Sequence, residues 1–85
     1  MKRIANKVAV ATICYTIKPS QKIKLYDYES VYDLYEHKNS KVVFKGLLTD
    51  SYNYKYSKWF DSQCYGLRIE DDSIVFDIVS KNEQY

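Results

Sequence analysis

Residues 64–79 read CYGLRIEDDSIVFDIV, and this stretch decides the fold. In 64–70 and in 73–79, apolar and polar side chains alternate with the period of two that is typical of a β-strand. Asp71 and Asp72 between them are residue types that favour turns. The stretch therefore predicts a β-hairpin. The apolar side chains expected to share one face of it are Leu67, Ile69, Ile74, Phe76 and Ile78.

Two earlier segments predict further strands. Residues 22–28 (KIKLYDY) alternate in the same way, with Ile23 and Leu25 on the buried side. Residues 41–46 (KVVFKG) predict another strand, with Val42 and Phe44 directed inward. Between them, residues 29–36 (ESVYDLYE) carry apolar side chains at helical spacing and predict a short helix.

Two segments fit more than one structure. Residues 7–17 (KVAVATICYTI) are apolar on both faces and rich in β-branched side chains, which favours a buried strand over the competing helix. In residues 47–60 (LLTDSYNYKYSKWF), Leu48, Tyr52 and Trp59 fit one helix face, whereas the tyrosines fit a period of two. We favour a helix, or a partly helical connection, because the strands otherwise lack a covering layer.

The sum of these elements is an α+β fold. We expect a small, mostly antiparallel sheet of four or five strands with one or two helices on one face. Residues 1–85 form a single domain, with 1–6 and 80–85 frayed at its ends. The predicted core is Val8, Val10, Ile13, Ile17, Ile23, Leu25, Val42, Phe44, Leu48, Leu67, Ile69, Ile74, Phe76 and Ile78.

Composition and charge narrow the class of protein. The chain is 46% hydrophobic with two glycines and one proline, which is typical of a globular protein. It contains neither a signal peptide nor the roughly 20 consecutive apolar residues of a membrane span, so we expect a cytoplasmic protein. We then expect Cys14 and Cys64 to be reduced and buried, with a disulfide between them as the alternative. The net charge is +2, with +5 in residues 1–46 and −3 in residues 47–85, which falls short of a dedicated nucleic-acid binder.

Tyrosine is the most informative residue type, at ten of 85 residues. Its ring is apolar and its hydroxyl is polar, so it suits surfaces that become dry on binding. The candidate partner-binding residues lie in one segment, where aromatic rings alternate with lysines: Tyr52, Tyr54, Lys55, Tyr56, Lys58 and Trp59. Three interpretations remain open for them, namely core packing, a protein interface and stacking on nucleic-acid bases.

A second tyrosine cluster is interleaved with acidic residues. Its members are secondary binding candidates: Tyr26, Tyr28, Tyr32 and Tyr35. The acidic neighbours repel phosphate and suit a basic protein surface. The alternative is an exposed strand end followed by a capped helix.

The sequence lacks the patterns of an enzyme or a metalloprotein. His37 is the single histidine and lies in a polar stretch without cysteine or histidine at ligand spacing. Pairing it with Cys14 or Cys64 as a nucleophile has no local signature. Gly46 and Gly66 stand alone, so no phosphate-binding loop is present. We therefore expect no catalytic residues, no metal and no cofactor.

Three stretches carry a resemblance to known proteins: KIKLYDY at 22–28, KVVFKG at 41–46 and EDDSIVFDI at 70–78. In this order they resemble small orphan proteins of bacteriophages and mobile elements in Gram-positive bacteria, the pool that includes anti-CRISPR inhibitors. The resemblance spans roughly residues 22–79. It implies a non-enzymatic protein that occupies a partner's surface, and it transfers no functional residue.

Three functions follow as hypotheses. The first is an inhibitor that sterically blocks a larger protein or ribonucleoprotein complex through the tyrosine, tryptophan and lysine surface. The second is a small nucleic-acid-binding domain that uses the tyrosines and the basic residues of the first half. These residues are Lys2, Arg3, Lys7, Lys22, Lys24, Lys41 and Lys45. The third is a homodimeric structural subunit that covers the outward-facing Val43, Val75 and Val79.

Overall fold

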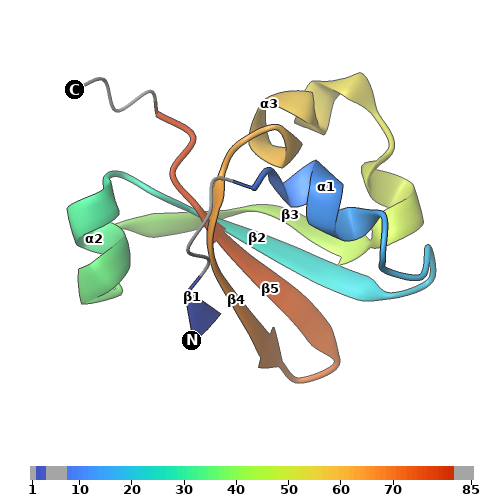
Figure 1. The fold of residues 1–85 in the computed structure, drawn as a ribbon, viewed down its shortest axis with the longest axis horizontal. Coiled ribbons are helices and arrows are strands. Elements are labelled where there is room, and N and C mark those ends of the chain that lie inside the picture. The colour runs from blue at the N-terminus through green and yellow to red at the C-terminus, as the bar shows by residue number, and fades with distance from the viewer. Residues whose placement is uncertain (1, 4–7, 82–85) are drawn as a thin grey trace.

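A computed structural model of the chain describes residues 2–3 and 8–81. It has the expected α+β class, with one five-stranded sheet in the order β1-β4-β5-β2-β3 (Figure 1). The strands are β1 (Lys2–Arg3), β2 (Lys22–Tyr28), β3 (Ser40–Leu47), β4 (Cys64–Glu70) and β5 (Ser73–Ile78). The helices are α1 (Val10–Cys14), α2 (Val31–Glu36) and α3 (Ser57–Phe60), and two 3-10 turns are η1 (Leu48–Ser51) and η2 (Tyr54–Tyr56).

The predicted hairpin is confirmed. Strands β4 and β5 are antiparallel, with Leu67 opposite Phe76 and Ile69 opposite Ile74. Strand β5 also pairs with β2, and this pairing is parallel, so the sheet is mixed. The end of the hairpin projects away from α1 and α3 (Figure 1). Ile69 lies near that end and is 70% exposed, so its place in the predicted core is wrong.

The preference for a strand over residues 7–17 is wrong, because Val10–Cys14 form helix α1 and, among the described residues of this segment, only Ala9 makes a β-bridge, to Gln63. Val10 and Cys14 are buried, while Ile13 and Ile17 pack partly buried against the same core. Their spacing is that of one helix face, and burial of this stripe outweighs the low helix propensity of β-branched side chains. Residue 7 lies outside the described residues.

Strand β3 confirms the prediction but contains a bulge. Leu25 pairs with Phe44, whereas the next residue, Tyr26, pairs with Val42, so Val43 is the extra residue. The bulge reverses the inward and outward alternation. Phe44 is buried as expected, but Val42 is 47% exposed and Val43 packs against the core. The predicted inward position of Val42 is therefore wrong.

The main core lies between the sheet and helices α1 and α3, which cover one of its faces (Figure 1). Helix α2 covers a smaller cluster of Tyr28, Leu34 and Val79. Val79 is therefore buried within this chain, and Val75 of β5 is fully buried as well. Their prediction as the outer face of a homodimer is wrong.

Four residues of the two segments that we expect to fray contact the rest of the chain. Lys2–Arg3 pairs with β4. At the other end, the backbone N–H and the hydroxyl of Ser80 donate to the buried carboxylate of Asp27. The remaining positions of those two segments lie outside the described residues. Within the described part of the chain, no helix has the length and hydrophobicity needed to cross a membrane.

Candidate functional site

The segment after β3 runs through η1, η2 and α3, which confirms the predicted partly helical connection. Its short turns direct successive aromatic rings to different sides. Tyr52 is 68% exposed and Tyr54 is 90% exposed. Tyr56 and Trp59, which are predicted in the same set, are half-buried and pack against the core.

Tyr56 and Trp59 form the edge of the hydrophobic core. The Tyr56 ring meets Phe44 edge to face, with ring centroids 4.9 Å apart, and the Trp59 ring lies 6.3 Å from that of Tyr56. The Lys55 Nζ lies 5.1 Å from the Tyr56 ring centroid, and the Lys58 Nζ lies 5.6 Å from the Trp59 ring centroid. The four residues therefore form one flank of stacked cations and rings.

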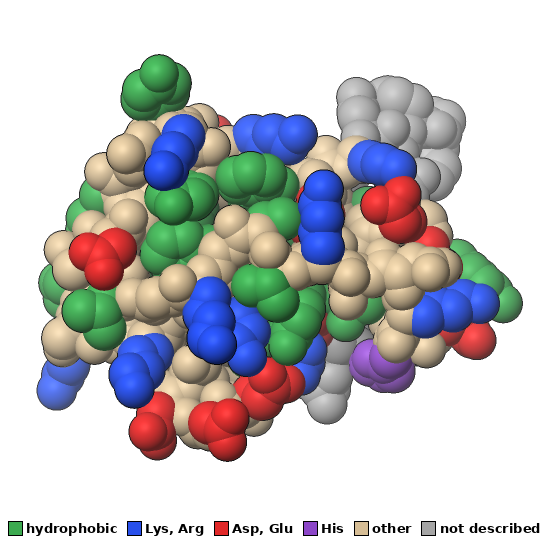
Figure 2. Space-filling view, turned by 180° about the vertical axis from the view of Figure 1, so that it is seen from behind, with side chains coloured by type: hydrophobic (Ala, Val, Ile, Leu, Met, Phe, Trp, Pro, Cys, Tyr) green, Lys and Arg blue, Asp and Glu red, His purple; other side chains and the backbone are tan. Residues whose placement is uncertain are grey.

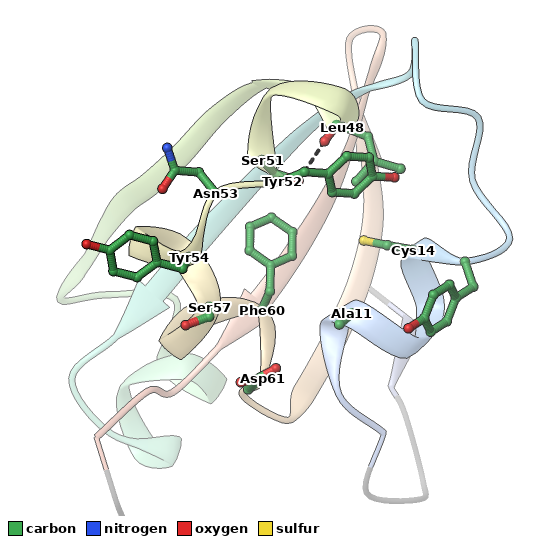
Figure 3. A pocket seen from close by; sticks show the side chains of 11 residues that line it. Ala11, Cys14, Leu48, Ser51, Tyr52, Asn53, Tyr54, Ser57, Phe60 and Asp61 are labelled. Atoms are coloured by element: carbon green, nitrogen blue, oxygen red, sulfur yellow. Dashed lines mark hydrogen bonds between the residues drawn. The ribbon is translucent and has the colours of Figure 1, made fainter.

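Tyr52 and Tyr54 belong to a different surface, the rim of a pocket of about 450 Å³. Figure 3 shows this pocket between α1, η1 and α3. Tyr15, at the end of α1, is the third ring at the rim and is 88% exposed. We call this site the tyrosine-rimmed pocket, and its three rim residues are Tyr15, Tyr52 and Tyr54.

The floor of the tyrosine-rimmed pocket is apolar. Cys14, Leu48 and Phe60 line it and are buried. Ser51 is also buried, and its hydroxyl donates to the Leu48 carbonyl at 2.6 Å (Figure 3). Burial raises the pKa of the Cys14 thiol to about 11, so the thiol stays protonated at neutral pH. The floor therefore suits an apolar group rather than a nucleophilic reaction.

Asp61 contributes the charge of this pocket. It is the only charged side chain among the described lining residues, and it is exposed. No ion pair or side-chain hydrogen bond to another described residue engages its carboxylate. Lys55 and Lys58 do not line the pocket, because their ammonium groups lie over Tyr56 and Trp59.

Sequence reasoning missed Tyr15 and Asp61 as site residues. Tyr15 lies in the segment that was assigned to a strand, and nothing in its local pattern links it to residues 52–54. The signal that could have found it is the helical spacing of Val10 and Cys14, which leaves the neighbouring Tyr15 on the exposed side of α1.

The second tyrosine cluster does not form one surface. Tyr28 is 5% exposed, and burial raises its pKa. Tyr26 is half-buried beside α2. Tyr32 and Tyr35 are exposed on α2, where the Lys38 Nζ lies 5.5 Å from the Tyr32 ring centroid. The alternative of an exposed strand end followed by a capped helix is right about the cap at Ser30, but the strand end is buried at Asp27 and Tyr28.

A polar network lies on the sheet face opposite the main core. Arg68 donates to the fully buried Asp77 at 3.3 Å and to Glu70 at 2.6 Å, and the Lys24 Nζ donates to Glu70 at 2.9 Å. Burial alone would lower the pKa of Arg68, but the bonds to Asp77 and Glu70 outweigh it and raise that pKa. Lys24 and Arg68 together lower the pKa of Glu70. This network engages Lys24, one of the predicted nucleic-acid contacts.

Cys64 and His37 complete the candidate reactive groups. Cys64 is fully buried, and burial raises its pKa to about 12. His37 ends α2 in the left-handed conformation (φ 57°) and is exposed. No side-chain hydrogen bond between the histidine and either cysteine is present in the described residues. Among those residues there is also no cluster of three or more potential metal ligands.

The basic side chains of the first half are distributed rather than gathered. Figure 2 shows lysine and arginine side chains at several places on the rear face, two of them side by side near the lower centre, with acidic side chains at the lower end and at both sides. Lys22 and Lys45 line a second pocket of about 400 Å³, together with Asp50 and Ser73. Lys2 and Arg3 lie in β1, and Lys7 is outside the described residues.

Neither a protein-family model nor a curated protein nor a solved structure matches this chain.

Proposed function

We propose that this chain is a non-enzymatic binding protein that blocks a surface of a larger protein or ribonucleoprotein complex. The observation that supports it is the tyrosine-rimmed pocket, where three largely exposed phenol rings surround an apolar floor. Exposed aromatic rings beside a preformed apolar depression are the usual anchors of protein interfaces. The proposed site of action is the cytoplasm of a bacterial cell, which follows from the resemblance to phage and mobile-element proteins.

The mechanism is steric. Tyr52 and Tyr54 become buried against the partner, and Tyr15 extends the contact from α1. Their rings lose little conformational entropy on binding, because only two torsions are fixed in each. Tyr56 and Trp59 pack against the core, Tyr56 through Phe44, and so fix the segment that carries Tyr52 and Tyr54. Lys55 and Lys58 lie on the flank and affect the rate of approach more than the contact itself.

The proposal predicts that single rim substitutions abolish partner capture without unfolding the domain. Tagged wild-type protein and its Tyr54→Ser variant are used to capture proteins from a lysate of a Gram-positive bacterium, with mass-spectrometric quantification. We expect the variant to capture at least about tenfold less of the specific partner than wild type does, because loss of an interface anchor weakens binding by that factor or more. Trp59→Ala is unsuitable for this test, because Trp59 packs against the core.

Tyr32→Ser is the matched control, since Tyr32 is 65% exposed but lies on α2. It should capture the partner as well as wild type does. Loss of capture with Tyr32→Ser and not with Tyr54→Ser would place the binding surface on the second tyrosine cluster instead. Capture that neither change affects would contradict the proposal.

Nucleic-acid binding is the second candidate, supported by the second pocket. Lys22 and Lys45 are exposed there and make no ion pair with a described residue. The candidate predicts that the protein binds a fluorescent single-stranded oligonucleotide in low salt and loses it steeply as salt rises. This candidate is excluded if the protein binds no oligonucleotide and captures a protein partner that the Tyr54→Ser variant does not capture.

A further inference from the structure

We propose that the tyrosine-rimmed pocket takes an apolar side chain of a partner protein together with a neighbouring arginine, whose guanidinium group pairs with Asp61. The inference rests on the proposed function and specifies the chemistry of the partner. This inference goes beyond a general apolar contact, because it requires a positive charge on the partner opposite Asp61.

The floor determines the apolar half of the ligand. Leu48 is fully buried, and Cys14 and Phe60 are almost so, which leaves hydrophobic atoms at the base of the pocket. The Ser51 hydroxyl already donates to a backbone carbonyl, so it is not a free donor for a polar ligand. The volume of about 450 Å³ lies within the range of roughly 300–1,000 Å³ that is common for ligand sites.

The charge distribution determines the polar half. Asp61 is exposed at the pocket edge, with no cation paired to it in the described part of the chain. The two nearest lysines along the chain, Lys55 and Lys58, are held over the Tyr56 and Trp59 rings. The pocket edge therefore presents a carboxylate that a partner's cation would neutralise, while a partner's carboxylate would be repelled.

Arginine fits this surface better than lysine does. Its planar guanidinium forms two parallel hydrogen bonds with a carboxylate, and it stacks on aromatic faces. The exposed rings of Tyr52 and Tyr54 line the same pocket as Asp61. A guanidinium at this edge pairs with the Asp61 carboxylate, and the neighbouring apolar side chain occupies the floor below the tyrosine rim.

The experiment compares two small probes in ¹H–¹⁵N NMR titrations of the full chain. N-acetyl-leucyl-arginine amide carries the proposed pair of side chains, and N-acetyl-leucyl-citrulline amide replaces the guanidinium with a neutral group of the same shape. We expect the arginine probe to shift the backbone amides of residues 14, 48, 60 and 61. We expect it to bind about two- to fivefold more tightly than the citrulline probe, as an exposed ion pair allows.

Asp61→Asn should remove the preference for the arginine probe. Asp50→Asn is the matched control, because Asp50 is also an exposed acidic residue of this region but lines the second pocket. The inference is overturned if the two probes bind equally, if Asp61→Asn keeps the preference, or if neither probe shifts the pocket amides. Equal binding at the pocket would leave the proposed function standing as apolar docking, and capture with the Tyr54→Ser variant decides that function separately.

Discussion

Asp77 is a fully buried carboxylate on β5, and the guanidinium of Arg68 is its partner. The arginine side chain is 27% exposed, so the two members of the pair are buried to very different extents. Such pairs stabilise a fold little compared with apolar replacements, but removing one partner leaves a charge without compensation. The stability lost when one partner is replaced therefore depends mainly on Asp77, which is the more buried of the two.

Arg68→Met should lower the free energy of unfolding by about 3–5 kcal/mol, because it leaves the Asp77 carboxylate buried without a counter-ion. The double variant Arg68→Met with Asp77→Leu should recover most of that loss, since it removes both charges. Urea unfolding followed by circular dichroism measures both. A double variant as unstable as Arg68→Met would show that packing, not the unpaired charge, causes the loss.

Single residues mark the limit of what the sequence predicts about the site. The excess of tyrosine predicts exposed rings, and Tyr52 and Tyr54 are among the most exposed large hydrophobic side chains. Tyr56 belongs to the same period-two pattern, yet its ring packs on Phe44. The difference arises from the direction of two short 3-10 turns, which no local pattern specifies.

At the scale of elements, helix α2 is limited at both ends by identifiable residues. The hydroxyl of Ser30 accepts a hydrogen bond from the Asp33 backbone N–H at 3.1 Å and caps the first turn. His37 ends the helix with φ 57°, a conformation that glycine adopts without a steric penalty. The N-terminus of α2 is therefore well capped by Ser30, whereas the backbone at its C-terminus is strained at His37.

Substitutions at these two ends should change stability in opposite directions. Ser30→Ala should lower the unfolding free energy by about 1 kcal/mol through loss of the cap. His37→Gly should raise it by about 1 kcal/mol, because the left-handed strain disappears. Thermal unfolding compares the two variants with wild type. Destabilisation by His37→Gly would mean that the imidazole makes a contact that outweighs the strain.

The elements show why some of the fold was predictable. The β4–β5 hairpin, β2, β3 and α2 each have a local pattern that identifies the type of element, and these types are confirmed, although Ile69 and Val42 are exposed. The prediction for residues 7–17 is wrong because their β-branched side chains favour a strand, whereas packing of Val10 and Cys14 on the sheet favours a helix. The bulge at Val43 reverses a face without any signal in the apolar pattern.

At the scale of the whole molecule, the main core joins distant parts of the chain. Cys14 of α1 and Cys64 of β4 are buried in the same cluster, together with Phe44 and Phe76. Both thiols have raised pKa values because they are buried. Their reactivity therefore reports the integrity of the whole core rather than of one element.

Native Cys14 should react with iodoacetamide at pH 8 about a hundredfold more slowly than the unfolded chain, because its pKa is about 11 instead of 9.0. The folded pKa is raised, so the stability gained by burying the neutral thiol is complete below pH 9 and is lost as the pH rises toward 11. Mass spectrometry of alkylated peptides measures the rate, with Cys64 as the internal comparison. If Cys14 were alkylated at the same rate in the native and the unfolded protein, its buried position in the core would be contradicted.

The parallel pairing of β2 with β5 has a consequence for synthesis on the ribosome. Strand β2 is complete at Tyr28, but the strand that covers its inner edge begins at Ser73. At roughly 5–20 residues per second, translation of the chain between them takes about 2–9 s. Strand β3 emerges within that time and pairs with one edge of β2, but the other edge, which β5 later covers, stays unpaired. We therefore expect the nascent chain to need chaperones most in the period before β5 emerges.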